Sequence, residues 1–201
     1  MIYLQYYDPK KEDIMQKIYQ NNDQFRLRKA GGSDLAELKA MYGRIIEKMN
    51  ADGIAIWDDF YPCELFENDI RDRQLYVLTD GGTIVSAFTL LDDISGSSSV
   101  EWQLSSERPI YLDRFGVNTE YRRCGIASLA LEKAQETALS LGADCLRLFV
   151  VNINSPAISL YEKNGFIRAK GIFTDIIDDE LVLHEYGYEI RPSENNCAVF
   201  R

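Results

Sequence analysis

The segment 108–171 constrains the fold of this chain most, because its blocks of apolar and polar residues predict a strand, a helix, a strand and a second helix. Residues 110–117 and Cys145–Val151 are rich in the branched and aromatic side chains of buried strands. Between them, residues 125–141 repeat apolar side chains at the three-and-four spacing of one buried helical face. Gly142 follows where helices often end in a left-handed cap. A strand, a helix and a strand in this order predict a right-handed crossover unit.

The turn into the first of these helices predicts an anion site. Arg122, Arg123 and Gly125 lie where the strand gives way to the helix. The first N–H groups of a helix have no intrahelical partner and lie at the positive end of its dipole, where phosphate binds well. Gly125 would let a bulky phosphate approach the backbone closely, and Ala127 is small for the same reason or for packing. The alternative is a solvated arginine pair in a loop.

A second pattern follows the strand Cys145–Val151. Ser155 and Pro156 are typical of the first residues of a helix, and Gly165 ends that helix. The chain thus contains Arg-x-x-Gly-x-Ala at 122–127 and Asn-x-x-Ala-x-x-Leu-Tyr-Glu-Lys-x-Gly-Phe at 154–166. The two patterns, in this order around a crossover unit, resemble the central motifs of the GNAT superfamily of acyl-CoA-dependent N-acetyltransferases.

This resemblance implies an α+β fold, an α/β sandwich in which helices flank a mixed, mostly antiparallel central sheet. The two central parallel strands, 110–117 and Cys145–Val151, should splay apart at their carboxyl ends and form a wedge for acetyl-CoA. The other segments fit the same order. Further strands are expected at Phe25–Lys29, 75–79, Thr83–Leu91, 166–173 and 180–190, and further helices at 63–71 and from Ser33, as N-cap, to about 49.

Residues 25–201 are expected to form a single domain of the GNAT type, since a chain of 201 residues is long enough for one substantial core. Residues 1–24 precede the place where the family fold begins. They predict a short strand or arm and an amphipathic helix, as an extension that packs on the body or reaches a second subunit, so a homodimer is left open.

The resemblance also implies a set of cofactor-binding residues. The backbone of Phe115, Gly116 and Val117 would bind the pantetheine arm of acetyl-CoA, with Gly116 in a bulge. The Val117 N–H would stabilise the oxyanion, an effect typically worth about 3 kcal/mol. The pyrophosphate would be held by Arg122 and by the N–H groups of Arg123, Cys124, Gly125, Ile126 and Ala127. Asn154 would touch the cofactor arm, cap the following helix or do both.

Alternatives stay open for several of these residues. Phe115, Gly116 and Val117 have the composition of ordinary strand packing. Cys124 is a conceivable nucleophile, because a helix N-terminus lowers the pKa of a thiol, although the family transfers the acyl group directly.

Two residues are expected to take part in proton transfer. Tyr161 is implied as the acid that protonates the leaving thiolate, the alternative being a core tyrosine. Asp113 is nominated as the base, because residues 111, 113, 115 and 117 share one side of a strand that has no bulge. Its alternative is a salt bridge with Arg114. Fallback bases are Glu101, Asp58 and Asp59, whereas the single histidine, His184, is expected to be paired or exposed on a late strand.

Trp57, Asp58 and Tyr61 are the candidate substrate-binding residues, because the segment 54–70 lies where the family places its substrate-facing helices. Phe60 and Glu64 are further candidates there, although the aromatic residues would equally serve a core and the acids a solvated surface. The expected function is transfer of an acetyl group from acetyl-CoA directly to a primary amine of a small molecule or peptide. The alternatives are a non-catalytic acyl-CoA-binding or regulatory module, and an interaction domain that uses residues 1–24.

Composition excludes several other classes. The formal net charge is −10 and no basic patch stands out, so nucleic acid is not an expected partner. An acidic protein does suit a cationic amine. Four cysteines without a CxxC pair, and one histidine, predict neither a disulfide framework nor a metal site. With no signal peptide and no apolar run of membrane-spanning length, a cytoplasmic location with reduced thiols is expected.

Overall fold

The computed structural model describes residues 9–20, 24–178 and 181–193, and within these residues eight strands form one sheet. Its strand order is β1-β2-β3-β4-β5-β8-β6, with β7 paired to β8. In chain order the main elements are α1 (Pro9–Gln20), β1 (Phe25–Lys29), α2 (Leu35–Ala51), α3 (Phe66–Arg71), β2 (Leu75–Asp80), β3 (Thr83–Leu91), β4 (Pro109–Val117), α4 (Ile126–Ser140), β5 (Cys145–Val151), α5 (Ser155–Lys163), β6 (Ile167–Arg168), β7 (Phe173–Ile176) and β8 (Val182–Ile190).

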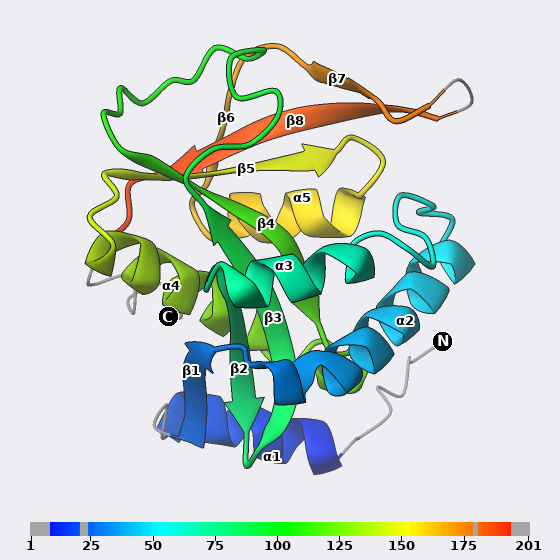
Figure 1. The fold of residues 1–201 in the computed structure, drawn as a ribbon. Coiled ribbons are helices and arrows are strands. Elements are labelled where there is room, and N and C mark those ends of the chain that lie inside the picture. Colours follow the sequence, from blue (N-terminus) through cyan, green and yellow to red (C-terminus); the bar gives the residue numbers. More distant parts are fainter. Residues whose placement is uncertain (1–8, 21–23, 179–180, 194–201) are drawn as a thin grey trace, which may run out of the picture.

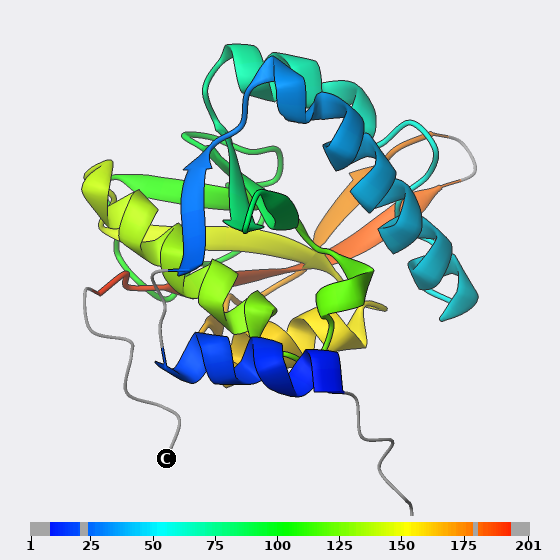
Figure 2. The ribbon, with the colours of Figure 1, turned by 90° about the horizontal axis from the view of Figure 1, so that it is seen from below.

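The sheet lies between two layers of helices. Figure 2 shows α2 and α3 on one face and α4, α5 and α1 on the other. On the α4 face, Leu131 and Ala134 pack with Leu112 of β4 and Leu148 of β5 in one buried cluster, which is the crossover unit predicted from segment 108–171. No helix in the described part of the chain is long and apolar enough to cross a membrane.

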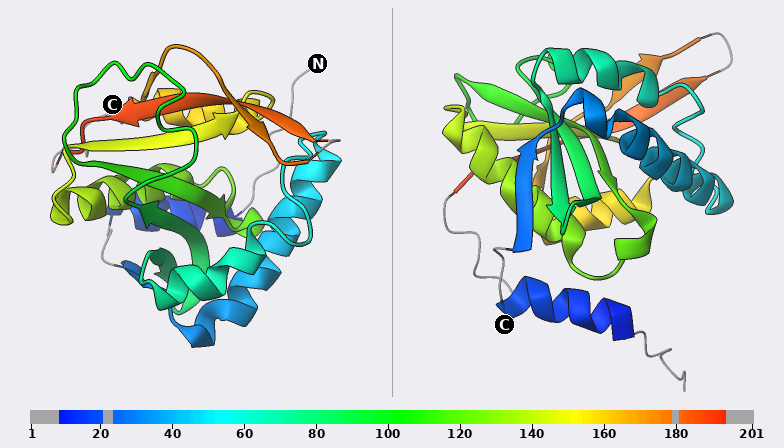
Figure 3. Two further views of the ribbon diagram at one scale, coloured as in Figure 1. Left: turned by 45° about the horizontal axis from the view of Figure 1, so that its top comes forward. Right: turned by 60° about the horizontal axis from the view of Figure 1, so that its bottom comes forward.

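The predicted mixed and mostly antiparallel sheet is confirmed, and so is the splay of its two parallel strands. Strands β4 and β5 pair only over Pro109↔Cys145, Ile110↔Leu146 and Tyr111↔Arg147. Beyond Tyr111 they are no longer paired, and their ribbons diverge toward their carboxyl ends (Figures 1 and 3). The backbone of β4 after Tyr111 therefore has one edge that β5 does not cover.

Two local predictions are wrong. The segment 166–173 is not one strand, because β6 ends at Arg168, Lys170 turns away to bridge Glu101, and β7 begins only at Phe173. Ser33 does not cap the second helix. Asp34 is the N-cap of α2, and its carboxylate is bound by Arg28 Nη2 at 2.7 Å and by the Gly31 N–H at 2.7 Å.

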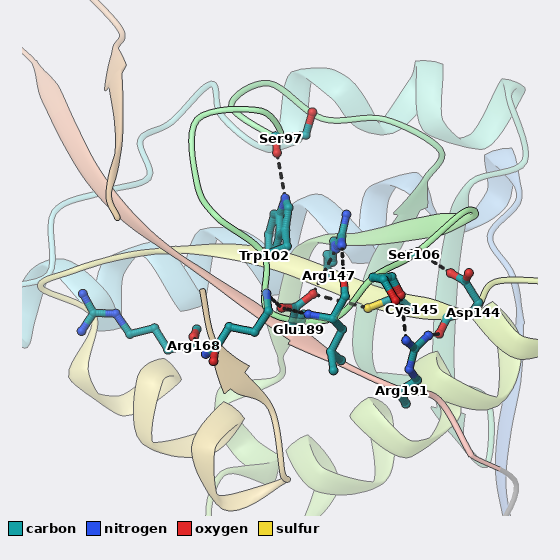
Figure 4. A network of polar contacts seen from close by, with 12 residues as sticks. Ser97, Trp102, Ser106, Asp144, Cys145, Arg147, Arg168, Glu189 and Arg191 are labelled. Atoms are coloured by element: carbon teal, nitrogen blue, oxygen red, sulfur yellow. Dashed lines mark hydrogen bonds and ion pairs between the residues drawn. The ribbon is translucent and has the colours of Figure 1, made fainter. Parts of the chain in front are cut away.

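A buried polar network fastens the long loop 92–108 to the sheet on the face opposite α4 (Figure 4). Glu189 of β8 is 0% exposed. Its carboxylate accepts hydrogen bonds from the Leu104 N–H at 2.9 Å and from Arg147 Nε at 3.3 Å. The Arg147 guanidinium lies over the Trp102 ring at 4.5 Å. This partnership explains how strand β5, otherwise apolar, carries an arginine in its centre, since a buried charge requires a partner.

The N-terminal helix α1 lies against the start of α4 (Figure 2). Its Ile14 is 3% exposed and belongs to a buried cluster with Tyr121, Cys124 and Leu129. The strand or arm predicted before α1 falls on residues 1–8, and most of the C-terminal tail on 194–201, both outside the described residues.

Candidate active site

Strand β4 contains a bulge that decides which way its side chains face. Thr89 of β3 pairs with Asp113, but Ala87 pairs with Gly116, so one residue of β3 lies opposite two of β4. The extra residue is Arg114, whose φ of 51° is in the left-handed region. The expectation that residues 111, 113, 115 and 117 share a side is therefore wrong, and the bulge lies earlier than Gly116, where the sequence predicted it.

After the bulge, Phe115 faces the α4 and α5 layer, where its ring centroid is 6.5 Å from that of Tyr161. Gly116 faces α2, where a Cβ atom would lie 2.8 Å from Cζ of Tyr42. The Tyr42 hydroxyl contacts the Arg114 carbonyl and is 3.2 Å from the Ala87 carbonyl oxygen. Glycine is required at position 116 by this close approach, and Tyr42 fixes the bulge in place.

The turn before α4 has the backbone shape of an anion-binding nest. Gly125 is the N-cap at φ 86°, and Arg123 is a non-glycine residue at φ 64°. The first intrahelical bond runs from the Leu129 N–H to the Gly125 carbonyl at 3.1 Å, so the amides of Ile126, Ala127 and Ser128 precede it. Left-handed residues in such a turn direct successive N–H groups to one point. The strain at Arg123, of order 1–3 kcal/mol, is typical of a functional site.

A cavity of about 1180 Å³ joins this turn to the splay. Its lining includes Phe115 and Val117 from β4, and Met15 from α1. Asn154, just before α5, and Leu160, within α5, also line it. Among the described residues that line it, five are cationic and three are acidic, although the whole chain has 22 Lys and Arg against 32 Asp and Glu. The cations are Lys48, Arg122, Arg123, Lys163 and Arg191, and the acids are Asp52, Glu132 and Glu162. This wall is therefore suited to an elongated anionic ligand.

Three of the cofactor-binding residues expected from the sequence have different surroundings: Arg122 faces the cavity, Cys124 lies in the core and Asn154 caps a helix. Arg122 lines the cavity and lies 3.8 Å from the carboxylate of Asp52. Cys124 is 2% exposed in the core cluster under α1, and its Sγ lies 3.5 Å from the Arg122 carbonyl oxygen, so its thiol is turned toward the core. Asn154, rather than Ser155, is the N-cap of α5, since its Oδ1 accepts from the Ala157 N–H at 3.3 Å.

Tyr161 lies on α5, in the apolar cluster beneath the splay. Its side chain is nearly enclosed, at 6% exposed, between Phe115, Phe166 and Tyr188. Burial, and next the charge of Asp113, raise the pKa of Tyr161 well above its ordinary value. In the described part of the chain its hydroxyl makes no hydrogen bond. A buried hydroxyl without a partner costs about 1–3 kcal/mol, and such a group points to a ligand that satisfies it.

Asp113 lies on the opposite face of β4 and is engaged by Arg114. Its carboxylate oxygens accept from the Arg114 N–H and from Arg114 Nη1, each at 2.7 Å. Arg114 also binds buried Asp69 through Nε and Nη2, each at 2.9 Å. Burial alone would lower the pKa of Arg114, but Asp113 and Asp69 raise it. The salt bridge between Asp113 and Arg114 that the sequence left open is therefore present.

Two aromatic residues from the segment before α3 adjoin this face. The ring centroid of Trp57 is 5.6 Å from that of Tyr42 and 6.5 Å from that of Tyr61. Burial, and next the negative charge of Asp113, raise the pKa of Tyr61 well above its ordinary value. Asp58 is exposed, and its Oδ1 accepts from the N–H groups of Phe60 at 2.8 Å and Tyr61 at 2.7 Å. Asp58 therefore shapes the turn that presents Tyr61.

The other two carboxylates considered as bases, and the single histidine, are exposed at the surface. Glu101 is exposed and ion-paired with Lys170 at 2.8 Å, and Asp59 is exposed. His184 is exposed, with Nδ1 3.3 Å from Thr174 Oγ1, which agrees with the expectation of a paired surface histidine.

Glu185 is a candidate that the sequence did not identify. It lies on β8 between Val151 of β5 and Phe173 of β7, at the carboxyl end of the splayed strand. It is half-buried, and burial, followed by the charges of Asp175 and Asp113, raises its pKa to about 7. The sequence offers no signal for it beyond its position in a strand, because its neighbours come from three other strands.

Comparisons with known proteins agree with this geometry. The family model described as "Acetyltransferase (GNAT) family" matches residues 44–166. The Bacillus subtilis (strain 168) protein YwnH, provisionally named a phosphinothricin acetyltransferase, is 30% identical over 115 residues, which are 57% of this chain and 66% of that protein. The Bos taurus thialysine N-epsilon-acetyltransferase is 43% identical over 58 residues, which are 29% of this chain and 34% of that enzyme. The chain thus spans less than two thirds of the length of these curated relatives.

A solved structure is similar in fold. The structure of yncA from Salmonella typhimurium, determined with its cofactor acetyl-CoA, matches with a TM-score of 0.58 and 14% identity, over 86% of this chain and 96% of that one. At this identity the likeness shows the fold alone.

Proposed function

Because the chain belongs to the GNAT family of acetyltransferases, we propose that it transfers an acetyl group from acetyl-CoA directly to a primary amine of a small molecule or peptide. The observation that carries this proposal is the junction of three features in one cavity. These are the uncovered edge of β4, the cationic nest before α4, and the walls of α4 and α5. An elongated anion with a thioester at one end and a diphosphate in its middle fits such a cavity.

The residues at this junction would share the work of binding. Arg122 and the N–H groups of Arg123 to Ala127 hold the diphosphate through charge-assisted hydrogen bonds. The backbone edge of Phe115, Gly116 and Val117 binds the pantetheine arm. The Val117 N–H donates to the oxygen on which negative charge develops during transfer. Asn154 caps α5 and borders the same arm.

Tyr161 supplies the proton that the departing thiolate needs. Its hydroxyl has no hydrogen-bonding partner among the residues that the structure describes, and this supports the role, because a sulfur at the foot of the splay would accept its hydrogen bond. Its raised pKa keeps the phenol protonated at neutral pH. The hydroxyl is therefore available as a donor throughout the working range.

Glu185, assisted by the negative field of Asp113, removes a proton from the incoming ammonium group. Asp113 is the weaker candidate for this step, because Arg114 occupies both of its oxygens. A general base works best with a pKa near the working pH, and that of Glu185 is about 7. Trp57 and Tyr61 line the approach of the amine, and the carboxylates of this region, including Asp58, favour a cation.

Replacing Glu185 with Gln tests this assignment. Its raised pKa means that the carboxylate form accumulates only as the pH rises through about 7. In the unaltered protein, kcat/KM should therefore rise over that range, and in Glu185→Gln it should be lower by about 10²-fold, with that limb lost. The measurement is a pH–rate profile of both proteins.

A stability measurement separates this role from a structural one. A carboxyl group whose folded-state pKa is raised stabilises the fold below its unfolded pKa, and that stability is lost as the pH rises to about 7. Glu185→Gln should thus gain stability relative to the unaltered protein at pH 8. A gain in stability with an unchanged pH–rate profile would make Glu185 a buried acid without a catalytic role.

Release of CoA in the presence of a panel of amines and peptides tests the function as a whole. Amine-dependent release, with mass spectrometry finding one acetyl group on the acceptor nitrogen, is the expected result. Tight binding of acetyl-CoA without turnover against the panel would instead favour a non-catalytic acyl-CoA-binding module.

A further inference from the structure

The helix α1 precedes the residues matched by the family model and yet forms part of the cavity wall. Met15 and Ile18 line the cavity together with Arg122 and Gly125. A Cβ atom on Gly125 would lie 3.5 Å from Cδ1 of Ile18. The extension therefore reaches the cationic nest itself, as Figure 2 shows by the position of α1 beside the start of α4.

One fully buried side chain anchors the described part of this helix to the body. Among the α1 side chains that the structure describes, only Ile14 is fully buried. Lys10 pairs with Glu120 at 3.0 Å, but the two side chains are 60% and 59% exposed, and such surface pairs stabilise little. A helix of 12 residues is marginal without tertiary contacts. A ligand that covers Met15 and Ile18 would thus add substantially to what fixes α1.

The positions of the other lining residues indicate which part of a ligand reaches α1. Phe115 and Val117 mark the splay, where a thioester would react, and Gly125 marks the nest, where a diphosphate would bind. Ile18 is adjacent to Gly125, so α1 is next to the nest rather than to the reacting end. The portion of acyl-CoA that continues past its diphosphate is the adenosine. Met15 is 39% exposed, and a thioether makes favourable contacts with aromatic rings.

We propose that α1 is part of the cofactor site, with Met15 and Ile18 forming the apolar wall against which the adenosine end of acyl-CoA packs. This inference rests on the proposed function, because it takes acyl-CoA as the ligand. The contacts of α1 would then add to the affinity for acyl-CoA, beyond the contacts made by the motifs on α4 and α5.

Calorimetry with two ligands tests the inference. The probes are acetyl-CoA and S-acetyl-4′-phosphopantetheine, which lacks the adenosine, its 3′-phosphate and one phosphate of the diphosphate. The double variant Met15→Ser and Ile18→Ser should bind acetyl-CoA about 10-fold more weakly, since it removes two apolar side chains from the contact. Its affinity for S-acetyl-4′-phosphopantetheine should not change. A matched double variant on exposed α1 positions, Glu12→Ser and Gln16→Ser, should bind both ligands as the unaltered protein does.

Two further measurements remain informative if the double variant unfolds. Met15→Ser alone changes an exposed side chain, and it should weaken acetyl-CoA binding about 3-fold. In the unaltered protein, hydrogen exchange of the amides of residues 9–20 should slow when acetyl-CoA is added, and should not slow with S-acetyl-4′-phosphopantetheine.

The contrary outcomes are distinct. An unaltered protein that binds no acetyl-CoA contradicts the proposed function. Normal binding that is insensitive to Met15→Ser and to the double variant overturns the inference about α1 alone. Equal weakening for both ligands removes the assignment to adenosine. Tighter binding by the variants, or faster exchange in α1 with acetyl-CoA, would make α1 a cap that the cofactor displaces, which also overturns the inference.

Discussion

Tyr161→Phe is expected to lower kcat by about 10²-fold or more, which is the lower end of what a positioned acid contributes. The substitution removes one hydroxyl and keeps the ring that packs on Phe115 and Phe166. Affinity for acetyl-CoA should change little, because the hydroxyl acts mainly when the thiolate forms. Steady-state kinetics and calorimetry of the variant measure both quantities.

Tyr188 provides the matched control. It is buried in the same cluster, but its hydroxyl donates to Glu162 at 2.8 Å. Tyr188→Phe should therefore cost about 1 kcal/mol of stability and leave kcat unchanged. Tyr161→Phe should not lose stability, since its hydroxyl has no partner to lose in the described part of the chain. A stability loss with normal kcat in Tyr161→Phe would make it a core residue and leave the proton to water.

Arg114→Met is expected to lower the free energy of unfolding by about 3–5 kcal/mol, because it leaves the buried carboxylate of Asp69 unpaired. The loss should shrink as the pH falls, since protonation neutralises that carboxylate. Chemical denaturation at several pH values measures both effects. Arg71 is a matched surface control, because its pair with Asp72 at 3.3 Å is exposed, and Arg71→Met should change stability by no more than about 0.5 kcal/mol.

A double variant distinguishes an unpaired charge from lost packing. Combining Arg114→Met with Asp69→Leu removes both charges, and it should recover much of the stability lost in the single variant. If the double variant is no more stable than Arg114→Met, the stability lost in Arg114→Met comes from the altered bulge rather than from the broken ion pairs.

Features set by contiguous residues were predictable from the sequence. The crossover unit and the turn at Gly125 follow from apolar spacing and from the chemistry of helix ends. The splay between β4 and β5 was implied by the resemblance, and the limited pairing up to Tyr111 confirms it.

Features set by distant partners were not predictable. The bulge at Arg114 depends on the register with β3 and on Tyr42 from α2. Because of this bulge, the side chains of Asp113 and Phe115 face opposite sides of the sheet, whereas in a regular strand they would face the same side. Burial raises the pKa of Glu185 most, followed by the charges of Asp175 and Asp113. These conditions depend on the pairing of β8 with β5 and β7 and on the position of β4 in the sheet. Ser33 is a good cap by type, but it lies inside a short 3-10 turn, Gly32–Asp34, that precedes α2. The Asp34 carboxylate accepts from the Gly31 N–H at the start of that turn and from Arg28, a residue of β1.

Binding of acetyl-CoA at the cationic turn before α4 is tested most directly by calorimetric titration of acetyl-CoA into the unaltered protein, Arg122→Glu and Asp52→Asn. We expect one site with a Kd on the order of tens of micromolar or tighter and binding weakened about 10-fold or more in Arg122→Glu. Binding should be at least as tight in Asp52→Asn, since the Asp52 carboxylate attracts the side chains of Lys48 and Arg122, both of which line the cavity. Absence of binding at that concentration, or an Arg122→Glu variant with unchanged affinity, would contradict a cofactor site at this turn.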